Sequence, residues 1–187
     1  MVRPVPVAEE EVIWRYADGS PLPLRIEYYV GVEPPEERLV TSVRAVVFSG
    51  DEVLVLRNRD AVHALPGGRR EPGETFEETL RREVLEETGY AIREAHPLGM
   101  AHLHHLGPAP PGYPFPHPDF YWAVYVAETA GRQISAPQDE YELGAALEPV
   151  EAALDRIDLP GRVRMPPNWA WQVGPLSEWD GTVKTRA

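Results

Sequence analysis

One stretch of the chain, residues 68–90, restricts more than any other what this sequence can fold into. It reads GRREPGETFEETLRREVLEETGY. Its residues fit the spacing G-x5-E-x7-R-E-U-x-E-E-x-G-U, where U is bulky and apolar: Gly68, Glu74, Arg82, Glu83, Val84, Glu86, Glu87, Gly89 and Tyr90. At average residue frequencies, such a match arises by chance in well below roughly one in a hundred thousand chains. The stretch is therefore treated as a functional motif.

The same stretch carries the signals that begin and end a helix. Thr75 and Glu78 form a capping-box pair, in which each side chain satisfies a free backbone N–H at the first turn. Gly89 is suited to the left-handed residue that closes a helix. Between them an apolar residue recurs every four positions, at Phe76, Leu80 and Val84. The pattern predicts a helix over residues 76–88 whose apolar stripe packs against a sheet.

The acidic residues of this helix need a cation. Glu83 and Glu87 border the apolar stripe, where an unpaired charge is costly, and Glu86 lies to one side of them. Carboxylates at this spacing also repel one another. Arg82 is expected in a different sector of the helix, so it is not predicted to be the main partner of Glu83 and Glu87. Hard oxygen ligands favour Mg²⁺ or Mn²⁺ over Zn²⁺, and the chain contains no cysteine.

The complete pattern resembles the Nudix box. The resemblance covers roughly residues 38–160 and implies the Nudix fold, an α+β architecture in which a mixed β-sheet lies between helices as an α/β/α sandwich. It implies hydrolysis of a nucleoside diphosphate linked to another group X, which releases a nucleoside monophosphate and phosphorylated X. Mg²⁺, with Mn²⁺ as the substitute, is the implied cofactor.

The resemblance also assigns roles by position. The implied metal ligands are Glu83, Glu86 and Glu87, with Glu71 as a helper that acts through water. Arg82 is implied to be a structural partner of Glu74, and Gly89 a structural residue. The general base is left open, because branches of the family place it differently. It is either Glu86 or a carboxylate in the loop before the last helix, and Glu140 and Glu142 are the candidates there.

Residues around the box are candidates for substrate binding. Gly67 and Gly68 begin a turn-rich loop whose backbone can approach a phosphate or a metal. A guanidinium matches phosphate oxygens bidentately, and one such contact is expected among Arg57, Arg59, Arg69 and Arg70. Stacking on a base is expected from Tyr113, Phe115 and Tyr121, although packing explains these rings as well. Of three neighbouring histidines, only His102 and His104 share a strand face. Without a further ligand at suitable spacing, they are interpreted as strand or pocket residues.

The remaining periodicity predicts four strands and a second helix. Apolar runs at 43–48 and 53–56 flank a turn and predict a β-hairpin. Further strands are expected at 98–106 and 120–127, joined by a proline-rich segment. Helical spacing is present over residues 148–157. An additional hairpin is predicted over residues 10–31, with its turn at Asp18-Gly19-Ser20-Pro21.

Composition limits the setting of the protein. The chain of 187 residues supports one compact domain over 38–160, with an N-terminal extension at 1–37 and a tail at 161–187. Three tryptophans in that tail predict packing on the domain, or else a homodimer contact: Trp169, Trp171 and Trp179. No secretory signal or membrane-spanning run is recognised, so a cytoplasmic location is expected. The net charge of −12 argues against a nucleic-acid partner and predicts that an anionic substrate needs divalent metal.

The substrate is not identified by the sequence. The features of the family's ADP-ribose, dinucleoside polyphosphate and coenzyme A branches are missing. Residues 113–116 resemble part of an NADH pyrophosphatase motif, but they lie too far downstream and the zinc-binding cysteines are absent. A MutT-like activity on nucleoside triphosphates is left by elimination. Two alternatives are a Nudix-fold nucleotide-binding or regulatory protein without turnover and, less favoured because cysteine is absent, an isoprenoid diphosphate isomerase.

Overall fold

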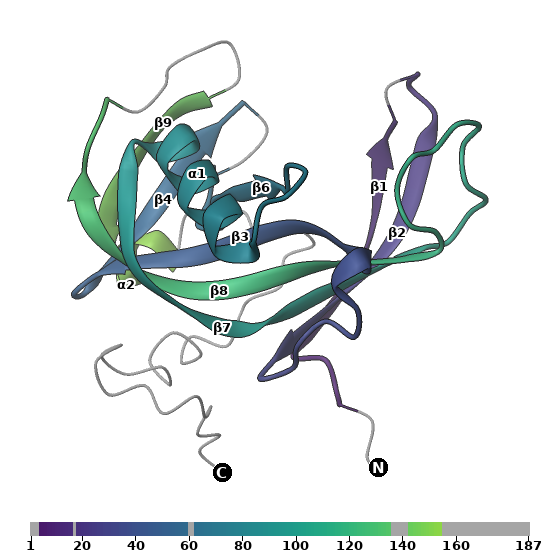
Figure 1. Cartoon of the computed structure of the whole chain (residues 1–187), viewed down its shortest axis with the longest axis horizontal. Coiled ribbons are helices and arrows are strands. Elements are labelled where there is room, and N and C mark those ends of the chain that lie inside the picture. Colours follow the sequence, from purple (N-terminus) through teal and green to yellow (C-terminus); the bar gives the residue numbers. More distant parts are fainter. Residues whose placement is uncertain (1–3, 17, 60–61, 136–141, 155–187) are drawn as a thin grey trace.

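The computed structural model describes residues 4–16, 18–59, 62–135 and 142–154. Its strands, with a single turn of 3-10 helix before β3, form one mixed sheet that carries a helix on each face (Figure 1). The strands are β1 (Ala8–Arg15), β2 (Pro21–Val30), β3 (Val40–Ser49), β4 (Glu52–Asn58), β5 (Val62–His63), β6 (Gly67–Arg69), β7 (Tyr90–His105), β8 (Asp119–Arg132) and β9 (Glu142–Pro149). The helices are α1 (Phe76–Thr88) and α2 (Val150–Leu154).

The sheet is antiparallel except at its centre. Its order is β1-β2-β7-β8-β3-β4-β5, with β6 paired to β3 and β9 paired to β4. Strands β3 and β8 run parallel. The expected α+β sandwich is therefore present, and the hairpins predicted at both places form as β1–β2 and β3–β4.

Both faces of the central strands are buried, which explains their continuous apolar runs. On one face, Leu80 and Val84 of α1 pack against a cluster that includes Val43, Val47 and Leu54. On the other face, Val150 and Ala153 of α2 pack against residues that alternate with these, including Val46 and Val53. The sheet is thus sandwiched between the two helices, and α1 lies over β3 and β6 in Figure 1.

The N-terminal hairpin shares a core with the rest of the sheet. Leu24 and Ile26 of β2 are fully buried against Ala101 and Leu103 of β7 and Phe120 of β8. Strand β2 continues the sheet beside the second half of β7. The hairpin is therefore an extension of the same sheet.

Three sequence expectations need revision in this part of the chain. Strand β7 begins at Tyr90, well before the predicted 98, and bends through irregular pairings with β8 near Ile92 and Pro97. Strand β9 occupies residues for which no strand was predicted. The helix predicted over 148–157 begins at Val150, and the described part ends at Leu154.

The tail with its three tryptophans lies outside the described residues, and the division into 1–37, 38–160 and 161–187 stays a prediction. Within the described residues, no helix is long and apolar enough to cross a membrane.

Candidate active site at helix α1

Helix α1 has the boundaries that its capping signals predict. The Thr75 hydroxyl accepts from the Glu78 backbone N–H at 3.2 Å, and the Glu78 carboxylate accepts from the Thr75 N–H at 2.8 Å. Gly89 ends the helix with a φ of 75°, in the left-handed region. Local chemistry therefore sets the phase of the helix, and with it the direction of every acid.

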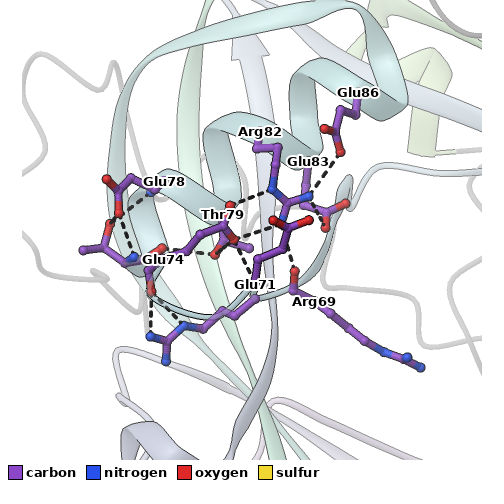
Figure 2. A network of polar contacts seen from close by, with 10 residues as sticks. Arg69, Glu71, Glu74, Glu78, Thr79, Arg82, Glu83 and Glu86 are labelled. Atoms are coloured by element: carbon purple, nitrogen blue, oxygen red, sulfur yellow. Dashed lines mark hydrogen bonds and ion pairs between the residues drawn. The ribbon is translucent and has the colours of Figure 1, made fainter.

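One guanidinium gathers most of the acids (Figure 2). Arg82 binds Glu74 bidentately, from Nε to Oε1 at 2.7 Å and from Nη2 to Oε2 at 2.9 Å. Its Nη1 also donates to Glu83 Oε1 at 2.9 Å and to Glu86 Oε2 at 3.1 Å. Nη2 further donates to the carbonyl of Arg69 at 3.0 Å. The pair with Glu74 agrees with the expectation. The placement of Arg82 away from Glu83 was wrong, because its long side chain contacts the carboxylate of this adjacent residue as well as that of Glu74.

The contact between Arg82 and Glu74 shifts the pKa values of both groups. The Arg82 guanidinium, helped by the Glu71 backbone N–H, lowers the pKa of Glu74 to about 2. The same contact with Glu74 raises the pKa of Arg82 above its usual range. Three carboxylates, those of Glu74, Glu83 and Glu86, therefore pair with a single guanidinium.

The glycine loop lies directly against the acidic face of α1. Gly67 donates its backbone N–H to Glu87 Oε2 at 2.8 Å. At Gly68, an added Cβ would stand 2.4 Å from the Glu83 carboxylate carbon. Only residues without side chains allow this approach, so β6 forms a backbone cradle beside Glu83 and Glu87.

The donor set at this cradle fits Mg²⁺. Glu83 is 15% exposed, Glu87 is half-buried, and Glu86 is 60% exposed, so the acids extend from the protected floor of the site to solvent. All three offer carboxylate oxygens, the ligands that Mg²⁺ and Mn²⁺ prefer. Glu71 is exposed beside them. Glu140 lies outside the described residues. Glu142 begins β9 opposite Asn58, and its side chain is not described.

The four candidate arginines differ in what they contact. Arg70 is engaged in the fold, because it donates to the Glu74 carbonyl, pairs with Glu37 at 2.8 Å and lies over the Phe76 ring. Arg69 extends its guanidinium away from the acidic network in Figure 2 and stacks over the Phe115 ring at 4.5 Å. Arg57 and Arg59 are exposed at the end of β4. Arg69 is therefore the candidate that the structure joins to both the box loop and the 107–118 segment.

The three candidate aromatic residues lie in two places. Phe115 contacts Arg69, and Tyr113 packs edge-on against Phe115 with centroids 5.4 Å apart. Tyr121 instead stacks on His102, with centroids 4.8 Å apart. The structure thus brings Tyr113 and Phe115 to the box loop, whereas one face of Tyr121 is covered by a histidine.

Sequence reasoning missed a second aromatic group near the glycine loop. Arg44 of β3 lies 4.6 Å over the ring of Trp122 and donates to the carbonyl of Leu65 at 3.0 Å. Trp14 of the N-terminal hairpin stacks on the same Trp122 at 5.8 Å. The two tryptophans are far apart in sequence, and the pairing of β1 with β2, of β2 with β7 and of β7 with β8 brings them together.

Comparison with known proteins agrees with the resemblance to the Nudix box. The family model described as NUDIX domain matches residues 38–168. A crystal structure of a Bacillus subtilis pyrophosphohydrolase resembles the fold with a TM-score of 0.51 and 21% identity, over 73% of this chain and 77% of that one.

Two curated relatives match shorter parts of the sequence. A Bacillus subtilis (strain 168) protein provisionally named as an 8-oxo-dGTP diphosphatase is 46% identical over 56 residues, which is 29% of this chain and 38% of the relative. The NAD-capped RNA hydrolase NudC of Pseudomonas entomophila (strain L48) is 33% identical over 108 residues, or 56% of this chain and 35% of the relative. The matched part thus spans little more than a third of the length of these relatives.

Proposed function

Because the chain belongs to the NUDIX domain family, we propose that it is a divalent-metal-dependent pyrophosphohydrolase that cleaves a nucleoside diphosphate linked to another group X. One observation carries the proposal. Glu83 and Glu87, on one face of α1, meet the side-chain-free backbone of Gly67 and Gly68. This places hard metal ligands next to a loop that can approach a pyrophosphate.

Glu83, Glu86 and Glu87 would hold Mg²⁺, with Mn²⁺ as the substitute and Glu71 as a helper through water. When bound, the metal neutralises the pyrophosphate and lowers the pKa of an attacking water. Arg82 contacts Glu83 and Glu86, so its guanidinium orients these carboxylates and competes with the metal for them. The net charge of −12 supports the need for a cation before an anionic substrate can approach.

Water attack on phosphorus needs a group that accepts a proton. Among the three proposed metal ligands, Glu86 is the exposed one, and its carboxylate is within reach of solvent. Glu140 and Glu142 remain candidates, although Glu142 is the first residue of β9 and does not lie in a loop. We propose Arg69, with the neighbouring Tyr113 and Phe115, as contacts for the part of the substrate beyond the pyrophosphate. Arg57, Arg70 and Tyr121 are weaker candidates. Arg70 and Tyr121 are already in contact with other side chains, and Arg57 is exposed at the end of β4.

The names of the curated relatives support a nucleotide substrate. One refers to 8-oxo-dGTP and the other to NAD-capped RNA. We propose a small nucleoside diphosphate derivative, because the strongly acidic chain is poorly suited to attract a nucleic-acid backbone. A second candidate function, nucleotide binding without turnover, is disfavoured because all the box acids are present.

A release assay for nucleotide and phosphate tests the proposal. The full chain would be incubated at alkaline pH with Mg²⁺ and then Mn²⁺. The panel would contain nucleoside triphosphates including oxidised ones, ADP-ribose, NAD and NADH, dinucleoside polyphosphates, nucleotide sugars and a short NAD-capped RNA. Cleavage of one compound far above a Glu87→Gln blank is the expected result. No cleavage of any compound, together with thermal shifts on the same compounds, would favour the binding protein instead.

A further inference from the structure

A second polar cluster lies on the sheet outside the box, where β2, β7 and β8 run side by side. In the strand register, His102 is opposite Glu27 of β2 and Tyr121 of β8, and His104 is opposite Asp119. Residues directly opposite each other share a face of the sheet. The pairing therefore brings two histidines and two carboxylates from three strands to one face.

The side chains of this cluster converge on one atom. His102 Nε2 and His104 Nδ1 each lie 2.8 Å from the same oxygen, Asp119 Oδ1. Among the described residues, these three form the one group of His, Cys, Asp or Glu side chains whose ligand atoms all lie within 4.8 Å of one another. Their side chains are 21%, 38% and 40% exposed, so an ion could enter from solvent and keep water as a further ligand.

The other nitrogen of His102 is also held. His102 Nδ1 lies 3.0 Å from Glu27 Oε2, and the ring stacks on Tyr121. A neutral imidazole has one N–H and cannot donate to Glu27 and Asp119 at once. If the N–H faces Glu27, the lone pair of Nε2 faces Asp119, and a cation bound between these two atoms makes this arrangement favourable. A histidine that ligates a metal through one nitrogen and donates to a carboxylate through the other is the usual arrangement around bound metals.

We propose that His102, His104 and Asp119 bind a divalent transition-metal ion, represented by Zn²⁺, and that Glu27 orients His102. Two imidazoles and one carboxylate suit Zn²⁺, Co²⁺ or Ni²⁺ better than Mg²⁺, which prefers oxygen ligands. The carboxylates of the box have the opposite preference. The chain therefore carries two metal sites of different chemistry.

The position of the site suggests what the ion does. His104 and Asp119 stand at the two ends of the segment that joins β7 to β8. That segment carries Tyr113 and Phe115, and Phe115 contacts Arg69 of the box loop. An ion bound to His104 and Asp119 would fasten the base of this segment and hold it beside the box. This role adds to the proposed function, but the metal site itself does not depend on it.

Zinc binding by the full chain can be measured without any activity assay. Zn²⁺ would be titrated in competition with a chromophoric chelator, and Co²⁺ would be added separately to record its visible absorption. The chain would carry Glu87→Gln in every sample to weaken binding at the box. The test variants are His104→Ala, the isosteric Asp119→Asn, and Glu27→Gln. The matched control is His96→Ala, which removes a partly exposed histidine from the same strand.

The expected result is one bound Zn²⁺ per chain and a Co²⁺ spectrum with nitrogen ligands, both unchanged by His96→Ala. His104→Ala and Asp119→Asn should weaken binding at least about tenfold, and Glu27→Gln should weaken it by roughly tenfold. Absence of Zn²⁺ binding would overturn the proposal and leave the cluster as a set of hydrogen bonds between the two histidines and the two carboxylates. Binding that survives both His104→Ala and Asp119→Asn would overturn it equally.

Discussion

The backbone of Gly68 touches the carboxylate of Glu83, and the fit leaves no room for a side chain. An added Cβ at position 68 would lie 2.4 Å from the Glu83 carboxylate carbon. Because that carboxylate is the far end of a flexible side chain, Gly68→Ala should displace Glu83 and leave the fold intact. If Glu83 is a metal ligand, we expect activity to fall by about 100-fold, as for other small displacements of reacting groups. Turnover assays and thermal unfolding on the same sample measure both effects.

Gly67 is the matched comparison, because an added Cβ there would collide with backbone atoms and not with a flexible side chain. A Cβ there would lie 2.2 Å from the carbonyl oxygen of Val43, and the φ of 136° is strained for any other residue. Gly67→Ala should therefore destabilise the protein by about 1–3 kcal/mol from the strained backbone alone, with a further cost from the overlap. Chemical denaturation would measure this loss. Equal stability of the two alanine variants would contradict the distinction.

Glu87→Gln tests the box acids directly. The amide can still accept the Gly67 N–H through its oxygen, so the loop should stay in place. Loss of the negative charge should lower turnover by at least about 100-fold. Glu77→Gln on the exposed side of the same helix, paired only with Arg81 among the described salt bridges, is the control and should change stability by no more than about 0.5 kcal/mol. Near-normal activity of Glu87→Gln would remove Glu87 as a ligand.

Removal of divalent metal should abolish activity. The box acids carry more negative charge than Arg82 neutralises, and an anionic substrate adds to it. Dialysis against EDTA followed by stepwise addition of Mg²⁺ or Mn²⁺ should eliminate and then restore turnover. Undiminished turnover in excess chelator would rule out the metal mechanism.

A lower pH should destabilise the fold through His63, the last residue of β5, which pairs with Leu56 of β4. Burial, and then the charge of Arg44, lower the pKa of His63 to about 4. Between pH 6.5 and 4 the unfolded chain takes up a proton at this residue and the folded chain does not. The contribution of His63 to the free energy of unfolding should therefore be fully present above pH 6.5 and be lost towards pH 4, a loss on the order of 3 kcal/mol. Denaturation of wild type and His63→Gln across this range should show a flatter curve for the variant. Parallel curves would exclude His63 as the cause.

The Arg69–Phe115 contact should couple the box loop to the 107–118 segment. The guanidinium lies 4.5 Å from the ring centroid, and Arg69 is exposed. A double-mutant cycle with Arg69→Met and Phe115→Leu should give a coupling of about 0.5–1 kcal/mol in unfolding free energy. If both residues bind substrate, each single variant should raise KM more than it lowers kcat. Additive stability effects with unchanged KM would remove this contact from the site.

The sequence alone was sufficient where the deciding interactions are local. Helix α1 runs over the predicted residues, because Thr75, Glu78 and Gly89 act on backbone groups only a few positions away. The box pattern likewise identified the family, which the family model confirms over residues 38–168. The half-buried positions of Glu83 and Glu87 and the exposure of Glu86 also follow from helical spacing.

Strand β9 and the first half of β7 could not be predicted from their own residues. Residues 142–149 contain no β-branched residue, and residues 90–97 include Glu94, His96 and Pro97. They are strands because neighbours already in the sheet, β4 and β8, offer them hydrogen-bonding partners. Tertiary context overrides weak local propensity in both places.

The sequence by itself determined the family, helix α1 and the acids that α1 presents, because capping and helical periodicity operate within one or two turns. Only the tertiary structure decided that Trp14 stacks on Trp122 and that Asp119 joins His102 and His104. These neighbours come from strand register, which depends on burying both faces of the sheet at once. The spacing of residues in the sequence does not show which strands will pair or in which register.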